Sequence, residues 1–486
     1  MPDFQPTEEQ LAITAAARES SDNLIISALA GAAKTSTLVL IAQELSKTLI
    51  LCLAFNRKIA EEMKERLPGN CEAKTLNSLG NGILRDMIGR WPKVDSRKVS
   101  TLIYEAVSSM EQGEEKKIAF GKLSEYGRGL SLAKANGYLP NGFTRPGLPA
   151  PKPLCGDEEF EDFFEEELEP WEISFLRAVY TESLNMAFAG DIDYDDQLLL
   201  PTLFAAPFPR PALTLIDEAQ DLSPLNHAML KKLVGTRRLI AVGDECQAIY
   251  GFRGADSKSM RRLEEEFSMK KLILSVSFRC PIAVVEHARW RAPHMKYPEW
   301  AKQGSVSEWH DWTIDEIPVD AAIVCRNNAP LFSLAMRMLK SGRYAQIVGT
   351  ELTKNLLKTM KKLGPATMPR DAVLSKLDQD LAAKLEKSKD PGPLRDRYEC
   401  MKVFAREGTT LGEAMAFAEH IFNAQSPTLL MTIHKSKGLE FNDVFILERE
   451  LIKKEGQDRN LRYVAQTRAK ETLVYIDFEG MAENVN

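Results

Sequence analysis

One short segment near the N-terminus combines the residue types that bind a nucleotide's phosphates. An apolar run, NLIISAL (residues 23–29), leads into AGAAKTSTL, and Lys34 and Thr35 open the helix-like stretch that follows. Backbone N–H groups of such a turn can cradle phosphates, an ammonium group compensates their charge, and a hydroxyl can ligate Mg²⁺. The pattern GxxxxGK[ST] is incomplete, because Ala28 and Ala33 stand at its two glycine positions. Taken alone, the segment is equally compatible with an ordinary strand-to-helix turn.

Two later segments carry the acidic and amide groups that a metal–nucleotide site needs. In LIDEAQD (residues 215–221), an apolar strand pattern ends in Asp217 and Glu218. Asp217 would hold Mg²⁺, and Glu218 would polarise the attacking water. A solvated Asp–Glu pair at a strand end is the alternative interpretation. It does not explain AVGDECQAIYGFRGAD, where a second strand pattern ends near Asp244 and Gln247.

The elements that would position these groups alternate between strand-like and helix-like patterns. Such alternation predicts parallel sheets with right-handed crossovers, and here it predicts two α/β domains, each with one mostly helical insertion. We expect a PGP linker (residues 391–393) in the second insertion. The insertion of the first domain contains an acidic run (157–169), for which we expect a solvated face with the phenylalanines turned inward. The expected strands lie at 23–29, 48–55, 212–220, 237–244, 270–278, 321–327, 344–349 and in three runs after 425.

Composition restricts the class of protein. The chain has 486 residues, 44% hydrophobic and 27% charged, which excludes disordered and fibrous classes. Its net charge of −6 means that any nucleic acid must be bound by local basic strips. Seven dispersed cysteines without a CxxC pair argue against disulfide and zinc frameworks. With an acidic N-terminus and no long apolar run, we expect no membrane contact and a soluble intracellular protein, cytoplasmic or nucleoid-associated.

In their order, these motifs resemble those of superfamily 1 helicases of the UvrD/Rep type. The short motifs are most similar to those of F-box-helicase-like and phage members. The resemblance runs from about Phe4 to Tyr475, apart from both insertions. It implies two RecA-like P-loop NTPase domains with parallel sheets, and ATP bound in a cleft between them. The expected boundaries are 1–90 with 191–271 for the first domain, 272–350 with 425–486 for the second, and 91–190 and 351–424 for the helical insertions.

The resemblance also assigns nucleotide roles. Gln10 would read adenine, Gln247 would sense the γ-phosphate, and Tyr250 would meet the nucleotide. Glu440 would hold the ribose, and two arginines of the second domain would reach the γ-phosphate. Ala33 departs from the family, which usually has glycine there, and is strained if the position needs a positive φ. The arginines are Arg279 and Arg468, and the phosphate loop comprises Ala30, Gly31, Ala32, Ala33, Lys34 and Thr35.

A further set of residues matches the family's contacts to single-stranded DNA. Asn77 departs from the histidine that is usual there. Phe252 could instead be a core aromatic, and His434 could be an ordinary hydrogen-bonded histidine. HARWRAPHMKYPEW (287–300) could line a DNA channel or form a solvated amphipathic helix. The expected DNA-binding residues are Phe55, Asn56, Thr75, Asn77, Phe252, Thr432 and His434.

The function that the resemblance implies is an ATP- and Mg²⁺-dependent translocase on single-stranded DNA. We expect 3′-to-5′ movement and unwinding of tailed duplex DNA, with no prediction for protein partners. Two alternatives stay open: an RNA-directed motor, and an ATP-gated nucleic-acid clamp or recombinase-displacing protein with weak unwinding.

Overall fold

The computed structural model describes residues 5–386, 388 and 391–481, so Phe4, where the family resemblance begins, lies outside the described residues. The described chain divides into two compact units. The first runs to Ala28 and continues from Ala33 to Leu274, and the second comprises Leu29–Ala32 and the chain from Ser275 onward. Among the described residues, no helix is both long and apolar enough to cross a membrane.

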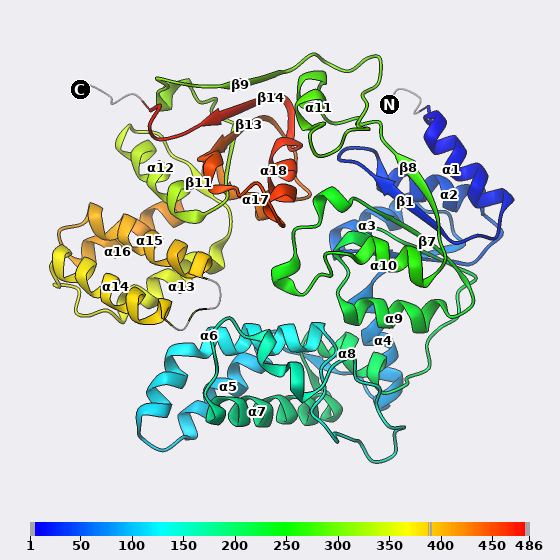
Figure 1. Ribbon diagram of the computed structural model, residues 1–486, viewed down its shortest axis with the longest axis horizontal. Helices are drawn as coiled ribbons and strands as arrows, with labels where there is room; N and C mark the ends of the chain where they lie inside the picture. The colour runs from blue at the N-terminus through cyan, green and yellow to red at the C-terminus, as the bar shows by residue number, and fades with distance from the viewer. Residues whose placement is uncertain (1–4, 387, 389–390, 482–486) are drawn as a thin grey trace. The chain divides into compact units, whose positions relative to one another are not determined.

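The first unit is built on a six-stranded sheet in which all neighbouring strands are parallel (Figure 1). Its strands, in spatial order, are β3 (Cys71–Thr75), β2 (Ile50–Ala54), β6 (Leu213–Ile216), β7 (Arg238–Gly243), β1 (Leu24–Ala28) and β8 (Lys270–Leu274). Helix α1 (Glu8–Glu19) precedes the first strand, and the helices between strands are α2 (Lys34–Glu44), α3 (Arg57–Arg66), α4 (Leu76–Ile88), α8 (Asp196–Leu203), α9 (Pro224–Val234) and α10 (Ser259–Glu266).

A helical insertion interrupts this sheet between α4 and α8. It consists of α5 (Lys98–Ser109), α6 (Glu114–Ala135), the short η1 helix (Asp157–Phe163) and α7 (Pro170–Ala189), and the three long helices pack side by side (Figure 1). Its ends meet in a small parallel pair, β4 (Lys93–Val94) with β5 (Asp191–Ile192). Phe160 and Phe164 of the acidic run are buried in the insertion's core, as expected.

The second unit contains another six-stranded parallel sheet, in the order β11-β12-β10-β13-β14-β9 (Figure 1). Its strands are β9 (Ser305–Glu308), β10 (Ala322–Cys325), β11 (Gln346–Ile347), β12 (Leu429–Thr432), β13 (Phe441–Leu447) and β14 (Ala469–Ile476). Its helices are α11 (Ile282–Ala288), α12 (Asn328–Lys340), α17 (Ile433–Ser436) and α18 (Asp458–Gln466), and the helices between β11 and β12 are α13 (Thr350–Lys361), α14 (Arg370–Leu385), α15 (Pro391–Glu407) and α16 (Leu411–Asn423).

The fold class is confirmed: two parallel six-stranded sheets with helical regions, as in two RecA-like domains. The linker predicted at 391–393 is wrong, because α15 begins at Pro391. Proline is tolerated in the first turn of a helix, where its missing N–H would have no intrahelical partner.

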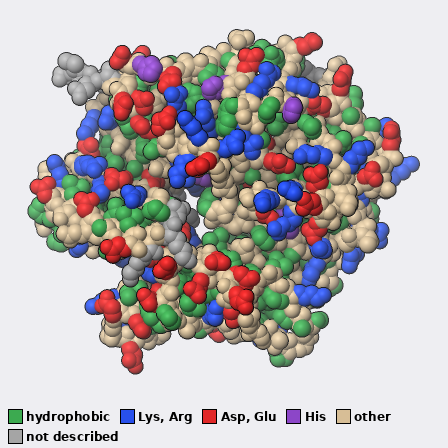
Figure 2. Space-filling model, viewed as in Figure 1, with side chains coloured by type: hydrophobic (Ala, Val, Ile, Leu, Met, Phe, Trp, Pro, Cys, Tyr) green, Lys and Arg blue, Asp and Glu red, His purple; other side chains and the backbone are tan. Residues whose placement is uncertain are grey.

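Charged side chains of both signs lie on the molecular face shown in Figure 2. On the face shown in Figure 2, lysine and arginine side chains intermingle with aspartate and glutamate side chains. This distribution fits the small net charge of −6.

Candidate functional site

The turn between β1 and α2 adopts a phosphate-loop conformation despite its missing glycines. α2 begins at Lys34, and Ala33 before it has φ 55° and ψ 43°, in the left-handed region. Gly31 also has a positive φ, of 75°. The strain foreseen for Ala33 therefore exists, since its Cβ makes this conformation costly for an L-residue.

Lys34 and Thr35 meet the two carboxylates that follow β6. The Lys34 Nζ lies 3.3 Å from Glu218 Oε1, and the Thr35 hydroxyl donates to Asp217 Oδ2 over 2.7 Å. Parallel strands bring these groups together, because β1 and β6 both end at the same edge of the sheet. A hydroxyl and a carboxylate are hard oxygen ligands of the kind Mg²⁺ takes, so this pair fits that ion.

Burial and mutual charge set the protonation of these groups. Burial, and then the charge of Glu218, raise the pKa of Asp217 to about 6 against the opposing effect of Lys34. Burial lowers the pKa of Lys34, but the charges of Glu218, Asp244 and Asp217 outweigh it and raise the pKa overall. Lys34 is therefore cationic at neutral pH, as a phosphate-binding lysine must be.

Gln220 joins the carboxylate segment to the segment that contains Gln247. Its side-chain amide donates to Glu218 Oε2, and its Oε1 accepts from the backbone N–H of Asp244 over 2.9 Å. Asp244 Oδ2 in turn accepts from Gln247 Nε2 over 2.6 Å. Glu218 and Gln247, assigned to water activation and γ-phosphate sensing, are thus connected through two further residues. We had not assigned roles to Gln220 or Asp244, although both stand in the motifs that we noted.

Gln10, the predicted adenine reader, is fully buried against α2. Its Nε2 donates to Thr37 Oγ1 over 3.0 Å, and its Oε1 accepts from the N–H of Thr7 in a capping box at the start of α1. The structure thus gives this side chain a role in joining α1 to α2, and adenine recognition stays a prediction.

Four side chains of the first unit form an aromatic and cationic cluster. Phe55 stacks on Tyr250, with ring centroids 5.9 Å apart and planes 6° apart. Phe252 meets Tyr250 edge to face at 6.1 Å, and the Arg253 guanidinium lies over both rings. Phe252 is 57% exposed, so the core-aromatic alternative is wrong. Tyr250, predicted to meet the nucleotide, thus lies with two predicted DNA-binding residues.

The other predicted DNA contacts of this unit make local hydrogen bonds. Asn56 and Thr75 are the side-chain N-caps of α3 and α4. The Asn77 side chain donates to the carbonyl of Tyr194 over 2.6 Å. These bonds orient the loops at the sheet edge, and the DNA contacts themselves stay predictions.

In the second unit, the nucleotide residues assigned by the resemblance lie together. Arg279 Nε donates to Glu440 Oε2 over 2.7 Å, although the two residues are 161 positions apart. Arg468 is only 1% exposed and donates to the carbonyls of Val464 and Leu439 at 3.0 and 3.1 Å. Both arginines are therefore bound to groups of their own unit.

Residues 29–32, which include the start of the phosphate loop, belong to the second unit. The N–H of Ala30 donates to the Tyr463 hydroxyl over 3.0 Å, and the carbonyl of Gly31 accepts from the N–H of Phe278 over 2.9 Å. A Cβ on Gly31 would lie 2.6 Å from Ser277 Oγ, so close packing as well as the positive φ requires glycine here.

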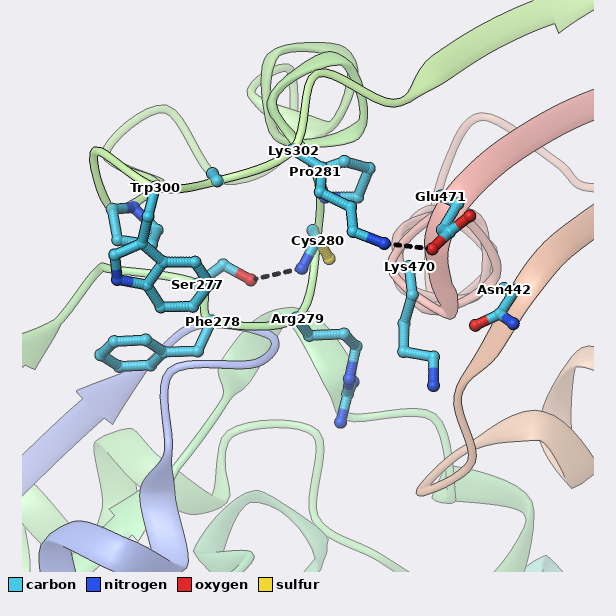
Figure 3. A pocket seen from close by; sticks show the side chains of 12 residues that line it. Ser277, Phe278, Arg279, Cys280, Pro281, Trp300, Lys302, Asn442, Lys470 and Glu471 are labelled. Carbon is cyan, nitrogen blue, oxygen red and sulfur yellow. Dashed lines mark hydrogen bonds and ion pairs between the residues drawn. The ribbon is translucent and has the colours of Figure 1, made fainter. Parts of the chain in front are cut away.

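A pocket of about 270 Å³ lies beside Arg279 (Figure 3). Phe278 stacks on Trp300 at one side of it, with ring centroids 6.2 Å apart, and an ion pair between Lys302 and Glu471 closes another side. Our sequence reasoning missed Phe278. The sequence could have indicated it, because Phe278 directly precedes Arg279, the arginine assigned to the nucleotide.

The remaining predicted DNA contacts stand where β12 ends. Thr432 is the last residue of β12, paired in register with Cys325 of β10, and it precedes the single-turn helix α17 that carries His434. The carboxyl edge of a parallel sheet is where ligands bind in α/β folds. The location suits the prediction but gives no contact that tests it.

Comparison with known proteins gives two family matches. The AAA domain family matches residues 10–253, about half of the chain, and the UvrD-like helicase C-terminal domain matches residues 427–476. F-box DNA helicase protein 1 of Schizosaccharomyces pombe is 23% identical over 539 residues, covering 97% of this chain and 57% of that protein.

Two bacterial helicases are similar over shorter stretches. DNA helicase IV of Escherichia coli is 29% identical over 293 residues, covering 50% of this chain and 41% of that protein. The ATP-dependent DNA helicase Rep of Escherichia coli is 35% identical over 91 residues, covering 17% of this chain and 14% of that protein. The chain thus spans 57% or less of the length of these relatives.

Proposed function

We propose that this chain, which belongs to the superfamily 1 UvrD-like helicases, hydrolyses ATP to move along single-stranded DNA and to unwind tailed duplex DNA. The observation that carries the proposal is the meeting of Lys34 with Glu218 and of Thr35 with Asp217 at one edge of a parallel sheet. A cation at a helix N-terminus facing two carboxylates is what nucleotide hydrolysis requires.

In this proposal, the chain's own groups divide the work of hydrolysis. Lys34 compensates phosphate charge, and Glu218 accepts a hydrogen bond from the attacking water and polarises it. Gln247 contacts the γ-phosphate and, through Asp244 and Gln220, is linked to Glu218. Thr35 and Asp217 would hold Mg²⁺, which neutralises phosphate charge when it is bound.

The same proposal gives Arg279 and Arg468 the task of stabilising charge on the γ-phosphate. Family resemblance supports this assignment. Arg279 is paired with Glu440, and Arg468 is bound to backbone carbonyls of its own unit. Each would therefore exchange these partners for phosphate oxygens during turnover, which would make hydrolysis depend on the arrangement of the two domains.

DNA would be gripped by the aromatic cluster of Phe55, Tyr250 and Phe252. Exposed rings can stack on any base, so they bind a strand without reading its sequence. Phe252 lies five positions after Gln247, so one short segment could couple the state of the nucleotide to the grip on the strand. The 3′-to-5′ direction rests on the family resemblance.

Paired substitutions at the ATP site test the proposal. Lys34→Ala should lose both ATP binding and hydrolysis. Glu218→Gln should keep ATP binding and lose hydrolysis by orders of magnitude. The measurement is ATP binding at equilibrium together with the steady-state hydrolysis rate. Hydrolysis at the parental rate by Glu218→Gln would show that another group activates water.

A further inference from the structure

Side chains of the segment 287–291 bind both ends of helix α18 and the strand β14 that follows it. His287 lies 2.7 Å from the Tyr475 hydroxyl, and the Trp290 indole N–H donates to Gln466 Oε1 over 3.0 Å. Arg291 Nε donates to Asn460 Oδ1, at the start of α18, over 2.9 Å. These hydrogen bonds join three side chains of the segment to elements of their own unit, and the two interpretations of the segment, as a DNA channel and as a solvated helix, stay predictions.

Gln466, the last residue of α18, is the centre of this arrangement. Its side chain is fully buried, and both ends of its amide are bound: Oε1 accepts from Trp290, and Nε2 donates to the Tyr475 hydroxyl over 2.7 Å. A buried amide left unpaired is destabilising, so this side chain has one favourable orientation.

The hydrogen bonds form a chain with a defined direction. Since the Tyr475 oxygen accepts from Gln466, its own proton is available to His287 Nε2. His287 can accept that proton only as a neutral imidazole. Burial, together with the charges of Arg462 and Arg449, lowers the pKa of His287 and favours the neutral ring. In this series of hydrogen bonds, Trp290 donates to Gln466, Gln466 donates to Tyr475, and Tyr475 donates to His287.

Gln466 lies next to the residues at the end of α18 that the proposed function assigns to the nucleotide site. Gln466 is separated from Arg468 by one residue, and Arg468 Nε donates to the carbonyl of Val464 in the same last turn. Tyr463, which binds the N–H of Ala30, lies one turn earlier. Any rotation of that turn would move both Tyr463 and Arg468.

We propose that Gln466 is a positioning residue for ATP turnover, which orients Arg468 and Tyr463 through its hydrogen bonds to Trp290 and Tyr475. The inference rests on the proposed function, since Arg468 matters only if it acts on the nucleotide. A displacement of about 1 Å in a group that stabilises the transition state can cost up to about 10²-fold in rate.

Two substitutions interrupt this series of hydrogen bonds at different points. Gln466→Leu deletes both hydrogen bonds. Trp290→Phe keeps an aromatic ring but deletes the indole N–H and reduces the ring, at a side chain that is 38% exposed. Each should lower kcat for ATP about 10-fold or more while changing KM by less than about 2-fold. Trp312→Phe is the matched control, because its indole N–H donates to the Asp477 carbonyl over 2.9 Å in the same unit, and it should keep the parental kcat.

Arg468→Ala separates failure of this inference from failure of the proposed function. If Arg468→Ala keeps parental turnover, the arginine assignment is wrong, and the positioning proposal falls with it. If Arg468→Ala is impaired but Trp290→Phe is not, only the positioning proposal is overturned. If both are impaired, adding Gln466→Leu to Arg468→Ala should lower kcat by less than the product of the two separate losses, since the effect of Gln466 through Arg468 is already lost. Additive losses would overturn the positioning role.

Discussion

Replacing Ala33 by glycine tests whether the phosphate loop is preformed. Ala33 has φ 55° and ψ 43°, a conformation that costs an L-residue about 1–2 kcal/mol. Glycine removes this cost but adds about 0.4–1 kcal/mol of chain entropy to the unfolded state. The expected net gain in stability is therefore about 1 kcal/mol, or a rise in Tm of about 2–4 °C for a unit of this size.

The effect on ATP binding shows whether the strain at Ala33 lowers the stability of the fold or weakens the binding of ATP. If the loop already holds this conformation before ATP binds, the cost of the strain belongs to folding and not to binding. Ala33→Gly should therefore raise the Tm while changing the Kd for ATP by less than about 2-fold. Thermal unfolding without nucleotide and equilibrium ATP binding are the two measurements.

Two alanines serve as controls for this substitution. Ala205 also has a positive φ, of 54°, so Ala205→Gly should raise the Tm without affecting ATP. Ala32 is buried and does not have a positive φ, so Ala32→Gly should lower the Tm. An unchanged Tm with about 5-fold tighter ATP binding in Ala33→Gly would refute the reasoning, since it would place the strain in the binding step.

Three further predictions concern catalysis, DNA and pH. Replacing either Arg279 or Arg468 by alanine should lower kcat by about 10³-fold with a smaller effect on nucleotide binding, and parental DNA-stimulated turnover in both variants would contradict their role. Phe252→Ala should lose base stacking worth about 1–3 kcal/mol, so DNA stimulation of ATP hydrolysis and strand displacement should fall together while basal hydrolysis persists. A folded Phe252→Ala variant that unwinds duplex DNA as well as the parent would show that the DNA strand does not contact this ring. Burial, and then the charge of Glu166, raise the pKa of Glu125 to about 7, so the folded protein retains a proton there that the unfolded chain loses above about pH 4.5. Stability should therefore fall as pH rises from about 4.5 to 7, and the slope of Tm against pH should be smaller in Glu125→Gln, whereas an equal slope would show that other groups control it.

The sequence predicted the strands that carry continuous apolar runs and missed four others: the short pair β4 and β5, and β3 and β9 of the six-stranded sheets. β3 (Cys71–Thr75) and β9 (Ser305–Glu308) form the edges of their sheets, and only Ala73 is buried among their residues. An edge strand contacts the core through few side chains, so its sequence need not be apolar. The interior strands, buried on both faces, carried the signal. The edge strands β8 and β11 were also predicted, because each lies in a run that contains leucine, isoleucine or valine.

The candidate site was predictable in part for a similar reason. Motifs next to strand ends indicated that the phosphate loop would face Asp217 and Glu218, because parallel strands end at one edge. The pairing of Arg279 with Glu440 and the burial of Gln466 depend on segments more than 150 residues apart in sequence. No local pattern encodes such contacts, and a buried glutamine cannot be told from an exposed one by its neighbours.

The central claim is that ATP hydrolysis drives movement on DNA. Its most direct test is the ATP hydrolysis rate with single-stranded DNA, with single-stranded RNA and without nucleic acid, paired with strand displacement on 3′-tailed and 5′-tailed duplex DNA. We predict stimulation by DNA above that by RNA, and displacement of the 3′-tailed duplex. Equal or greater stimulation by RNA would indicate an RNA-directed motor, and DNA-stimulated hydrolysis without displacement of either duplex would contradict the helicase assignment.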